Sequence, residues 1–232
     1  MPDRCIGMIG LGRLGKVVAA RLAEYNHLVL YDRNSELMEE VAQAIGAMTA
    51  DSLEEVACCN VVLLAVPDRE VISCIKDFNL LNKEMVVINM ATNVAQAVLE
   101  QTAIQPVKCM GVKFVGHAGE MALGLEPVII VNERPQELVE EVSRLFAPVG
   151  HVIVGRADMV TEINTIAAEK ALEAGVLIEE VLTSRGYGNP EIIQSAIQQV
   201  GAGILKAYAT DDLGPFAREI VRTVKAKMQK KF

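Results

Sequence analysis

The chain has 232 residues, 51% of them hydrophobic, and a formal net charge of −8. The length suits a domain of about 150 residues followed by a smaller one. The acidic balance argues against a nucleic-acid partner, because such proteins present a basic face. No apolar run approaches the roughly 20 residues of a membrane span, and the first residues lead directly into an apolar run, leaving no room for a signal peptide. We therefore expect a cytoplasmic protein.

The first segment in chain order is also the most informative. Residues 5–9 form an apolar run typical of a buried strand, and residues 16–24 have the spacing of an amphipathic helix. Between them lies the pattern Gly-x-Gly-x-x-Gly. Its first glycine makes a tight turn, its second lets a pyrophosphate approach the backbone at a helix N-terminus, and its third lets the helix pack on the strand. The segment predicts a dinucleotide site formed by Gly10, Leu11, Gly12, Arg13, Leu14 and Gly15.

The next strand, expected at 27–31, ends at Asp32, which lies 20 residues after Gly12. A carboxylate at this position bonds the ribose 2′-OH of NAD, whereas Arg33 suits adenine stacking or the 2′-phosphate of NADP. The two residues favour opposite cofactors. We expect NAD(P) binding with NAD preferred, since NADP would place a dianion near Asp32.

Strand and helix signals continue to alternate up to residue 155. Further strands are expected at 61–66, 85–89, 108–115, 127–131 and 151–154, and helices at about 34–45, after Ser52, after residue 93 and from Pro135 to about residue 146. Such apolar runs are typical of a parallel sheet buried on both faces. We predict an α/β fold: a Rossmann, doubly wound, mainly parallel sheet forming an NAD(P)-binding domain over residues 1–155. Strand ends at Val66 and Pro67, and at Ala91 and Thr92, then lie at the cofactor edge.

Residues 156–232 lack strand signals and predict a small all-helical domain. Apolar residues recur at 160, 163, 167, 171, 174, 178 and 181, which predicts a long helix over about 158–185. Asn189 with Pro190, and later Pro215, begin two further helices. Three helices in so short a segment cannot cover this apolar stripe within one protomer, so we expect a homodimer formed through them.

These landmarks resemble the β-hydroxyacid dehydrogenase and pyrroline-5-carboxylate reductase superfamily, with its 6-phosphogluconate dehydrogenase-type NAD(P)-binding domain. The similar segments are Gly7 to Gly15, Leu64 to Asp68 and Ile88 to Thr92. Val115 to Gly119, followed by Gly124, is similar to the substrate loop of prephenate dehydrogenases, although their His-Pro is here His-Ala. The tail looks like the short dimerising tails of pyrroline-5-carboxylate reductases and deazaflavin-dependent NADP oxidoreductases.

The chain departs from two members of this superfamily. Hydroxyisobutyrate-type dehydrogenases have a lysine three residues before an asparagine on the long helix, where this chain has Thr161 before Asn164. Pyrroline-5-carboxylate reductases have a Ser-Gly-Ser-Gly-Pro run where this chain has residues 162–166. Both departures bear on the substrate rather than on the cofactor.

Three residues are candidates for the chemistry, and no metal site is expected because His27, His117 and His151 are scattered. His117 lies in a glycine-flanked loop, and an imidazole can exchange a proton near neutral pH; the alternative is a loop histidine bonded to backbone. Asn164 interrupts an apolar helix face and must form a hydrogen bond, to substrate or to another element. Thr161 lies on the same helical turn. Lys113 is expected to be solvated.

We therefore predict an NAD(P)-dependent oxidoreductase that transfers hydride to or from a small carbonyl, hydroxy acid or cyclic imine. An imine reductase resembling pyrroline-5-carboxylate reductase is the alternative among enzymes. A dinucleotide-binding regulatory protein without turnover is the alternative from another class, because the helix lysine is missing and the tail is short.

Overall fold

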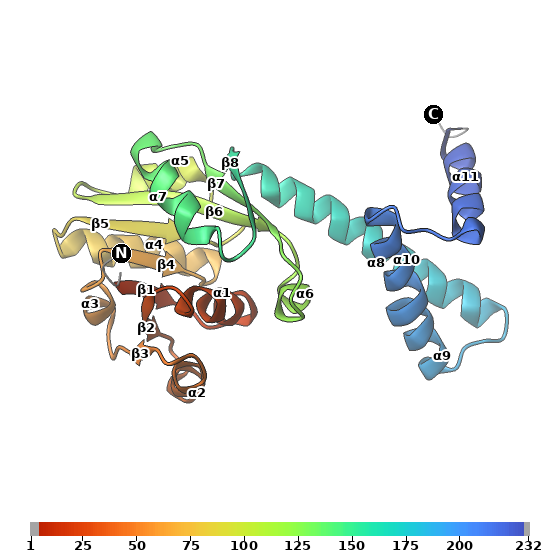
Figure 1. Cartoon of the computed structure of the whole chain (residues 1–232), viewed down its shortest axis with the longest axis horizontal. Helices are drawn as coiled ribbons and strands as arrows, with labels where there is room; N and C mark the ends of the chain where they lie inside the picture. The colour runs from red at the N-terminus through yellow and green to blue at the C-terminus, as the bar shows by residue number, and fades with distance from the viewer. Residues whose placement is uncertain (1–4, 230–232) are drawn as a thin grey trace. The chain divides into compact units, whose positions relative to one another are not determined.

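The computed structural model describes residues 5–229, which form two compact units (Figure 1). The first unit ends at Thr165 and the second begins at Ile166. The expected domain boundary at residue 155 coincides with the end of the last strand. The compact units divide later in the chain because the first turn of the long helix α8 (Met159–Ser184) packs on the sheet, with Val160 fully buried.

An eight-stranded sheet forms the centre of the first unit, in the order β3-β2-β1-β4-β5-β6-β7-β8. The strands are β1 (Cys5–Ile9), β2 (His27–Tyr31), β3 (Met48–Thr49), β4 (Val61–Leu64), β5 (Met85–Asn89), β6 (Val107–Val115), β7 (Val128–Asn132) and β8 (His151–Gly155). Neighbouring strands are parallel, except that β6 and β7 are antiparallel. The order of the first six strands is that of the doubly wound dinucleotide-binding sheet, so the predicted fold class is confirmed.

Helices cover both faces of this sheet (Figure 1). They are α1 (Arg13–Ala23), α2 (Ser35–Ile45), α3 (Leu53–Val56), α4 (Asp68–Leu80), α5 (Gln96–Thr102), α6 (Ala118–Ala122) and α7 (Gln136–Phe146). Helices α2 and α3 begin where their capping residues predict, since Asn34 accepts a bond from the N–H of Leu37, and Ser52 from that of Glu55. Helices α4 and α6 are not among the expected elements.

Successive side chains of the parallel strands point to opposite faces of the sheet and so fill two hydrophobic cores, one on each face. In β4, Val61 and Leu63 face α1, α2 and α7, whereas Val62 and Leu64 face α3, α4 and α5. Every residue of this strand is buried, which is the reason its sequence reads as an unbroken apolar run. Because β1, β4 and β5 are parallel neighbours, their carboxyl ends lie at one edge of the sheet, where the loops that follow them can form a common site.

The second unit is helical. After the rest of α8 it contains α9 (Pro190–Ser195), the π-helical turn η1 (Ala196–Gly201), α10 (Ala202–Ala209) and α11 (Pro215–Gln229). Exposed apolar side chains on α8 extend beyond the stripe expected from the sequence, because Leu172, Val176 and Leu177 are each more than half exposed. Within residues 5–229, none of the helices is long and apolar enough to cross a membrane.

Candidate functional site

The turn between β1 and α1 needs glycine at two positions. Gly10 has a φ of +91°, and a Cβ there would lie 2.5 Å from the carbonyl oxygen of Ala65. A Cβ on Gly15 would collide with the carbonyl oxygen of Gly10. Both glycines therefore permit α1 to pack tightly against the ends of β1 and β4, as the motif predicts.

Gly12 is different, because the fold itself does not require a glycine there. Its φ of −62° is open to any residue, and an added Cβ would meet no atom of the described residues within 4 Å. It is the N-cap residue of α1, and the first turn, which begins with Arg13 and Leu14, contains no acidic side chain. An open, uncapped helix N-terminus fits a pyrophosphate that approaches bare backbone.

Asp32 is held beside this turn. Its Oδ2 accepts a hydrogen bond of 2.6 Å from the backbone N–H of Leu11, and its Oδ1 accepts one of 2.9 Å from that of Asn34. Each carboxylate oxygen keeps a further lone pair, and the residue is partly exposed. The carboxylate is thus fixed where it can still accept a bond from a ribose hydroxyl.

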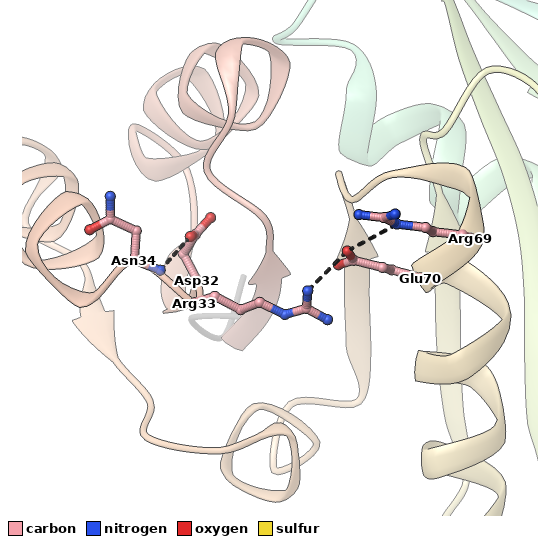
Figure 2. Close-up of polar contacts among 5 residues, drawn as sticks. All are labelled: Asp32, Arg33, Asn34, Arg69 and Glu70. Atoms are coloured by element: carbon pink, nitrogen blue, oxygen red, sulfur yellow. Dashed lines mark hydrogen bonds and ion pairs between the residues drawn. The ribbon is translucent and has the colours of Figure 1, made fainter.

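Arg33 points away from Asp32 towards the start of α4 (Figure 2). Its Nη1 lies 3.0 Å from Glu70 Oε1, and the Nε of Arg69 lies 3.9 Å from the same oxygen. The side chain of Glu70 is only 18% exposed, compared with 76% for Arg33 and 86% for Arg69. Glu70 therefore contacts both arginine side chains, whereas the hydrogen bonds to the Asp32 carboxylate come from backbone N–H groups. Glu70 was not expected to belong to this site, because Arg33 lies far from it in the sequence.

A pocket of about 220 Å³ opens next to the turn. It is lined by Leu14, Ala65, Val66, Asp68, Met90, Ala91, Thr92 and Asn93. The structure thus brings together four of the expected cofactor residues, Leu14, Val66, Ala91 and Thr92, while Pro67 serves as the N-cap residue of α4. Asp68 and Asn93 were not singled out from the sequence. Asn93 Nδ2 donates a bond of 2.8 Å to Asp68 Oδ2 and so connects α4 to the facing loop.

The facing segment is the β5–α5 loop (residues 90–95), which is held by hydrogen bonds from buried side chains. Buried Asn89 donates to the carbonyl oxygens of Ala91 and Val94, both at 3.3 Å, and accepts from the N–H of Ala91 at 3.0 Å. The Nζ of Lys113 donates to the carbonyls of Ala91, Thr92 and Val94. Lys113 is 1% exposed, so the expectation of a solvated lysine is wrong. Its place near the carboxyl end of β6, a strand between β5 and β7, buries it, and the loop carbonyls supply the polar partners that water would otherwise provide.

Thr161 and Asn164, the two candidates on the long helix, lie in the first two turns of α8 and bond to backbone carbonyls of the same unit. Thr161 Oγ1 donates a bond of 2.8 Å to the carbonyl oxygen of Thr92, which belongs to the β5–α5 loop. Asn164 Nδ2 donates a bond of 2.9 Å to the carbonyl oxygen of Phe114 in β6. The required partner of Asn164 is thus a backbone group, and Thr161 acts on the loop beside the pocket. A catalytic role for either residue stays a prediction.

His117 is exposed and lies apart from this group. It is the N-cap residue of α6, and its carbonyl oxygen accepts a bond from the N–H of Met121. Arg21, in the last turn of α1, donates to the carbonyls of Met121 and Leu125. These bonds hold the His117 segment against the end of α1 that is remote from Gly12. His117 is not among the side chains that line the pocket, and its proposed role stays a prediction.

The strand order, the open glycine turn, the acid after β2 and the pocket at the strand ends together define a dinucleotide-binding Rossmann protein. Residues 5–93 match the family described as NADP oxidoreductase, coenzyme F420-dependent. No curated protein matches the sequence. In the part of the chain that the structure describes, no three His, Cys, Asp or Glu side chains form a group that could hold a metal ion.

The fold of nearly the whole chain is similar to that of solved oxidoreductases. A pyrroline-5-carboxylate reductase from Coxiella burnetii superposes with a TM-score of 0.70 at 13% identity, over 97% of this chain and 92% of that one. A putative oxidoreductase from Mycobacterium avium 104 gives 0.71 at 20% identity, over 91% and 76%. A Plasmodium falciparum pyrroline carboxylate reductase with NADP bound gives 0.63 at 15% identity, over 98% and 92%. The family match bears out the superfamily resemblance over residues 5–93, and the solved structures show the same fold over nearly the whole chain.

Proposed function

We propose that this chain is an NAD(P)-dependent oxidoreductase that transfers hydride to or from a small carbonyl, hydroxy acid or cyclic imine. The observation that carries the proposal is the open position at Gly12 directly beside a pocket at the ends of β4 and β5. The family match and the fold shared with reductases support it. A dinucleotide-binding protein without turnover remains the alternative from another class.

In this proposal the backbone at Gly12 binds the pyrophosphate and Asp32 binds the adenosine ribose. The pocket receives the nicotinamide, which supplies or accepts the hydride when bound. Leu14, Val66 and Ala91 present apolar surface that orients the ring and excludes water, while the rigid β5–α5 loop fixes one wall. The protein's contribution is therefore mainly positioning.

One feature of the pocket favours imines as substrates, and this supports the imine reductase, the alternative enzyme predicted from the sequence. Reduction of a carbonyl needs a proton donor, whereas a protonated imine already carries its proton and needs only hydride. Asp68 is the one acidic or basic residue among the side chains that line the pocket, and a carboxylate there suits a cationic substrate better than a keto acid.

A panel of substrates tests this function. Purified protein is given NADH or NADPH with cyclic imines, keto acids and semialdehydes, and cofactor oxidation is followed by absorbance. Turnover is expected with at least one of these classes, and turnover restricted to imines would establish the imine reductase. Tight cofactor binding in calorimetry without turnover of any class would contradict the enzyme and support the regulatory alternative.

His117 remains our proposed proton partner for carbonyl substrates. Replacing it with alanine is expected to lower kcat by roughly 10² to 10⁴ while NADH affinity stays unchanged, because the cofactor site is separate. His151→Ala, at another exposed histidine, is the matched control and should leave kcat unaltered. An unaltered rate in His117→Ala would make His117 a structural loop residue.

We further propose that NAD is preferred over NADP, with Glu70 contributing to the choice. Glu70 neutralises Arg33, which leaves the Asp32 carboxylate to face the ribose without a free arginine for a 2′-phosphate. Wild-type protein is expected to bind NADH at least tenfold more tightly than NADPH, a difference of about 1.4 kcal/mol. Glu70→Gln and Asp32→Ala should each reduce or invert this preference in calorimetry.

Glu54→Gln is the matched control for Glu70→Gln, because it removes the same negative charge at an exposed position on α3. It should leave the ratio of the two affinities at the wild-type value. If Glu70→Gln also leaves the ratio unchanged, Glu70 has no part in cofactor choice. If the wild-type protein prefers NADPH, Arg33 dominates over Asp32.

A homodimer through the helices of the second unit completes the proposal, since those helices carry exposed apolar side chains throughout. Cytoplasmic localisation stays a prediction from the sequence.

A further inference from the structure

A lysine side chain is buried beneath one wall of the pocket. Lys113 is 1% exposed, although lysine is almost never fully buried unless it is paired. Its Nζ lies 2.9 Å from the carbonyl oxygen of Thr92 and 2.7 Å from that of Val94, and it also donates to the carbonyl of Ala91. An ammonium has three N–H donors, and the loop offers it these three acceptors.

The three acceptors belong to a short stretch of the β5–α5 loop. Two of the residues that supply them, Ala91 and Thr92, line the pocket. A single group bonded to three carbonyls so close in sequence restricts the loop to one backbone conformation. Asn89 bonds two of the same carbonyls at the longer distance of 3.3 Å, and Thr161 bonds the third. Within residues 5–229, Lys113 is therefore the one side chain that bonds all three carbonyls.

We propose that Lys113 is a positioning residue for the nicotinamide half of the dinucleotide, acting through the carbonyls of the β5–α5 loop. This inference rests on the proposed function, in which the pocket receives the nicotinamide. Lys113 acts at a distance from the substrate, because its side chain is enclosed by β6 and the loop. Its role is to keep Ala91 and Thr92 in the wall against which the ring is held.

Comparison of NADH with ADP-ribose isolates this role. ADP-ribose keeps the adenosine, pyrophosphate and second ribose but lacks the nicotinamide, so the ratio of the two affinities reports the ring's contribution. Lys113→Met preserves most of the side-chain length and removes the donors. In calorimetry it is expected to weaken NADH binding by at least about tenfold, or about 1.4 kcal/mol, and to change ADP-ribose binding by less than about twofold.

Lys108→Met is the matched control, because Lys108 lies on the same strand but its side chain is 31% exposed and pairs with Glu137. It should change neither affinity. A parallel loss of NADH and ADP-ribose binding in Lys113→Met would reduce Lys113 to a structural residue, and unchanged binding of both would also overturn the inference. If wild-type protein binds neither ligand, the proposed function itself fails.

A second measurement uses the unaltered protein and so does not depend on folding of the variant. Burial lowers the pKa of Lys113 to about 8, while the carboxylates of Asp158 and Asp68, at the starts of α8 and α4, act in the opposite direction. Burial raises the pKa of Cys109, four residues earlier on β6, to about 12, so that thiol stays neutral. Above the lysine's pKa, a neutral amine has two N–H donors for three carbonyls.

The ratio of NADH to ADP-ribose affinity should therefore fall as the pH rises through the pKa of Lys113. Measurements at about pH 7 and about pH 9 bracket the pKa of Lys113 and compare its charged and neutral forms. We expect the nicotinamide contribution to be smaller at the higher pH in wild-type protein. A ratio that is the same at both pH values would contradict the proposed role of the ammonium.

Discussion

Replacing Gly12 with valine is expected to abolish dinucleotide binding and leave the fold intact. A Cβ at this position meets no atom of the described residues within 4 Å, and the backbone φ of −62° suits any residue. The added side chain would occupy the space through which a pyrophosphate approaches the helix N-terminus. NADH affinity should fall at least about 100-fold, or about 2.7 kcal/mol, in calorimetry.

The thermal unfolding midpoint of Gly12→Val should stay within about 4 °C of wild type, because valine in place of glycine at this N-cap position costs only about 1 kcal/mol. Gly15→Val is the contrasting variant, since its side chain would collide with the carbonyl oxygen of Gly10. It should lose both binding and stability. Unchanged NADH affinity in Gly12→Val would mean that the turn is not the phosphate site, and the proposed function would lose its main support.

Replacing Leu172 with aspartate is expected to convert a dimeric protein into a monomer. Leu172 lies on α8 and is 70% exposed in the single chain, as Val176 and Leu177 are at 54% and 58%. A helix this apolar on its exposed surface needs a partner, and stable dimers of this kind bury more than about 2,000 Å². The substitution would bury an unpaired charge in each subunit, which is strongly destabilising.

Light scattering at micromolar concentration measures this change in mass directly. Leu80→Asp is the matched control, because Leu80 is an apolar residue that is 83% exposed on α4 of the first unit. It should leave the mass of the dimer unchanged. A monomeric wild-type protein with its fold intact by circular dichroism would rule out the dimer.

The sequence alone was sufficient for the cofactor half of the candidate site. Strands β1, β2 and β5 have the bounds that their apolar runs predict, and Gly10 and Gly15 have the tight geometry expected of the motif. These features depend on neighbours in the chain: a run of apolar residues, a capping side chain or a glycine at a turn acts over a few residues. The short strand β3 and the five-residue helix α6 carry too few residues for such a signal.

Only the tertiary structure decided which polar side chains meet around the pocket. Glu70 pairs with Arg33, Asn93 bonds Asp68, and Lys113 lies beneath the β5–α5 loop instead of in solvent. These contacts depend on the order of the strands, which places β4, β5 and β6 side by side, and on the face that each residue takes in its strand. Strand order and pairing register arise from packing between distant segments, so local patterns in the sequence do not contain them.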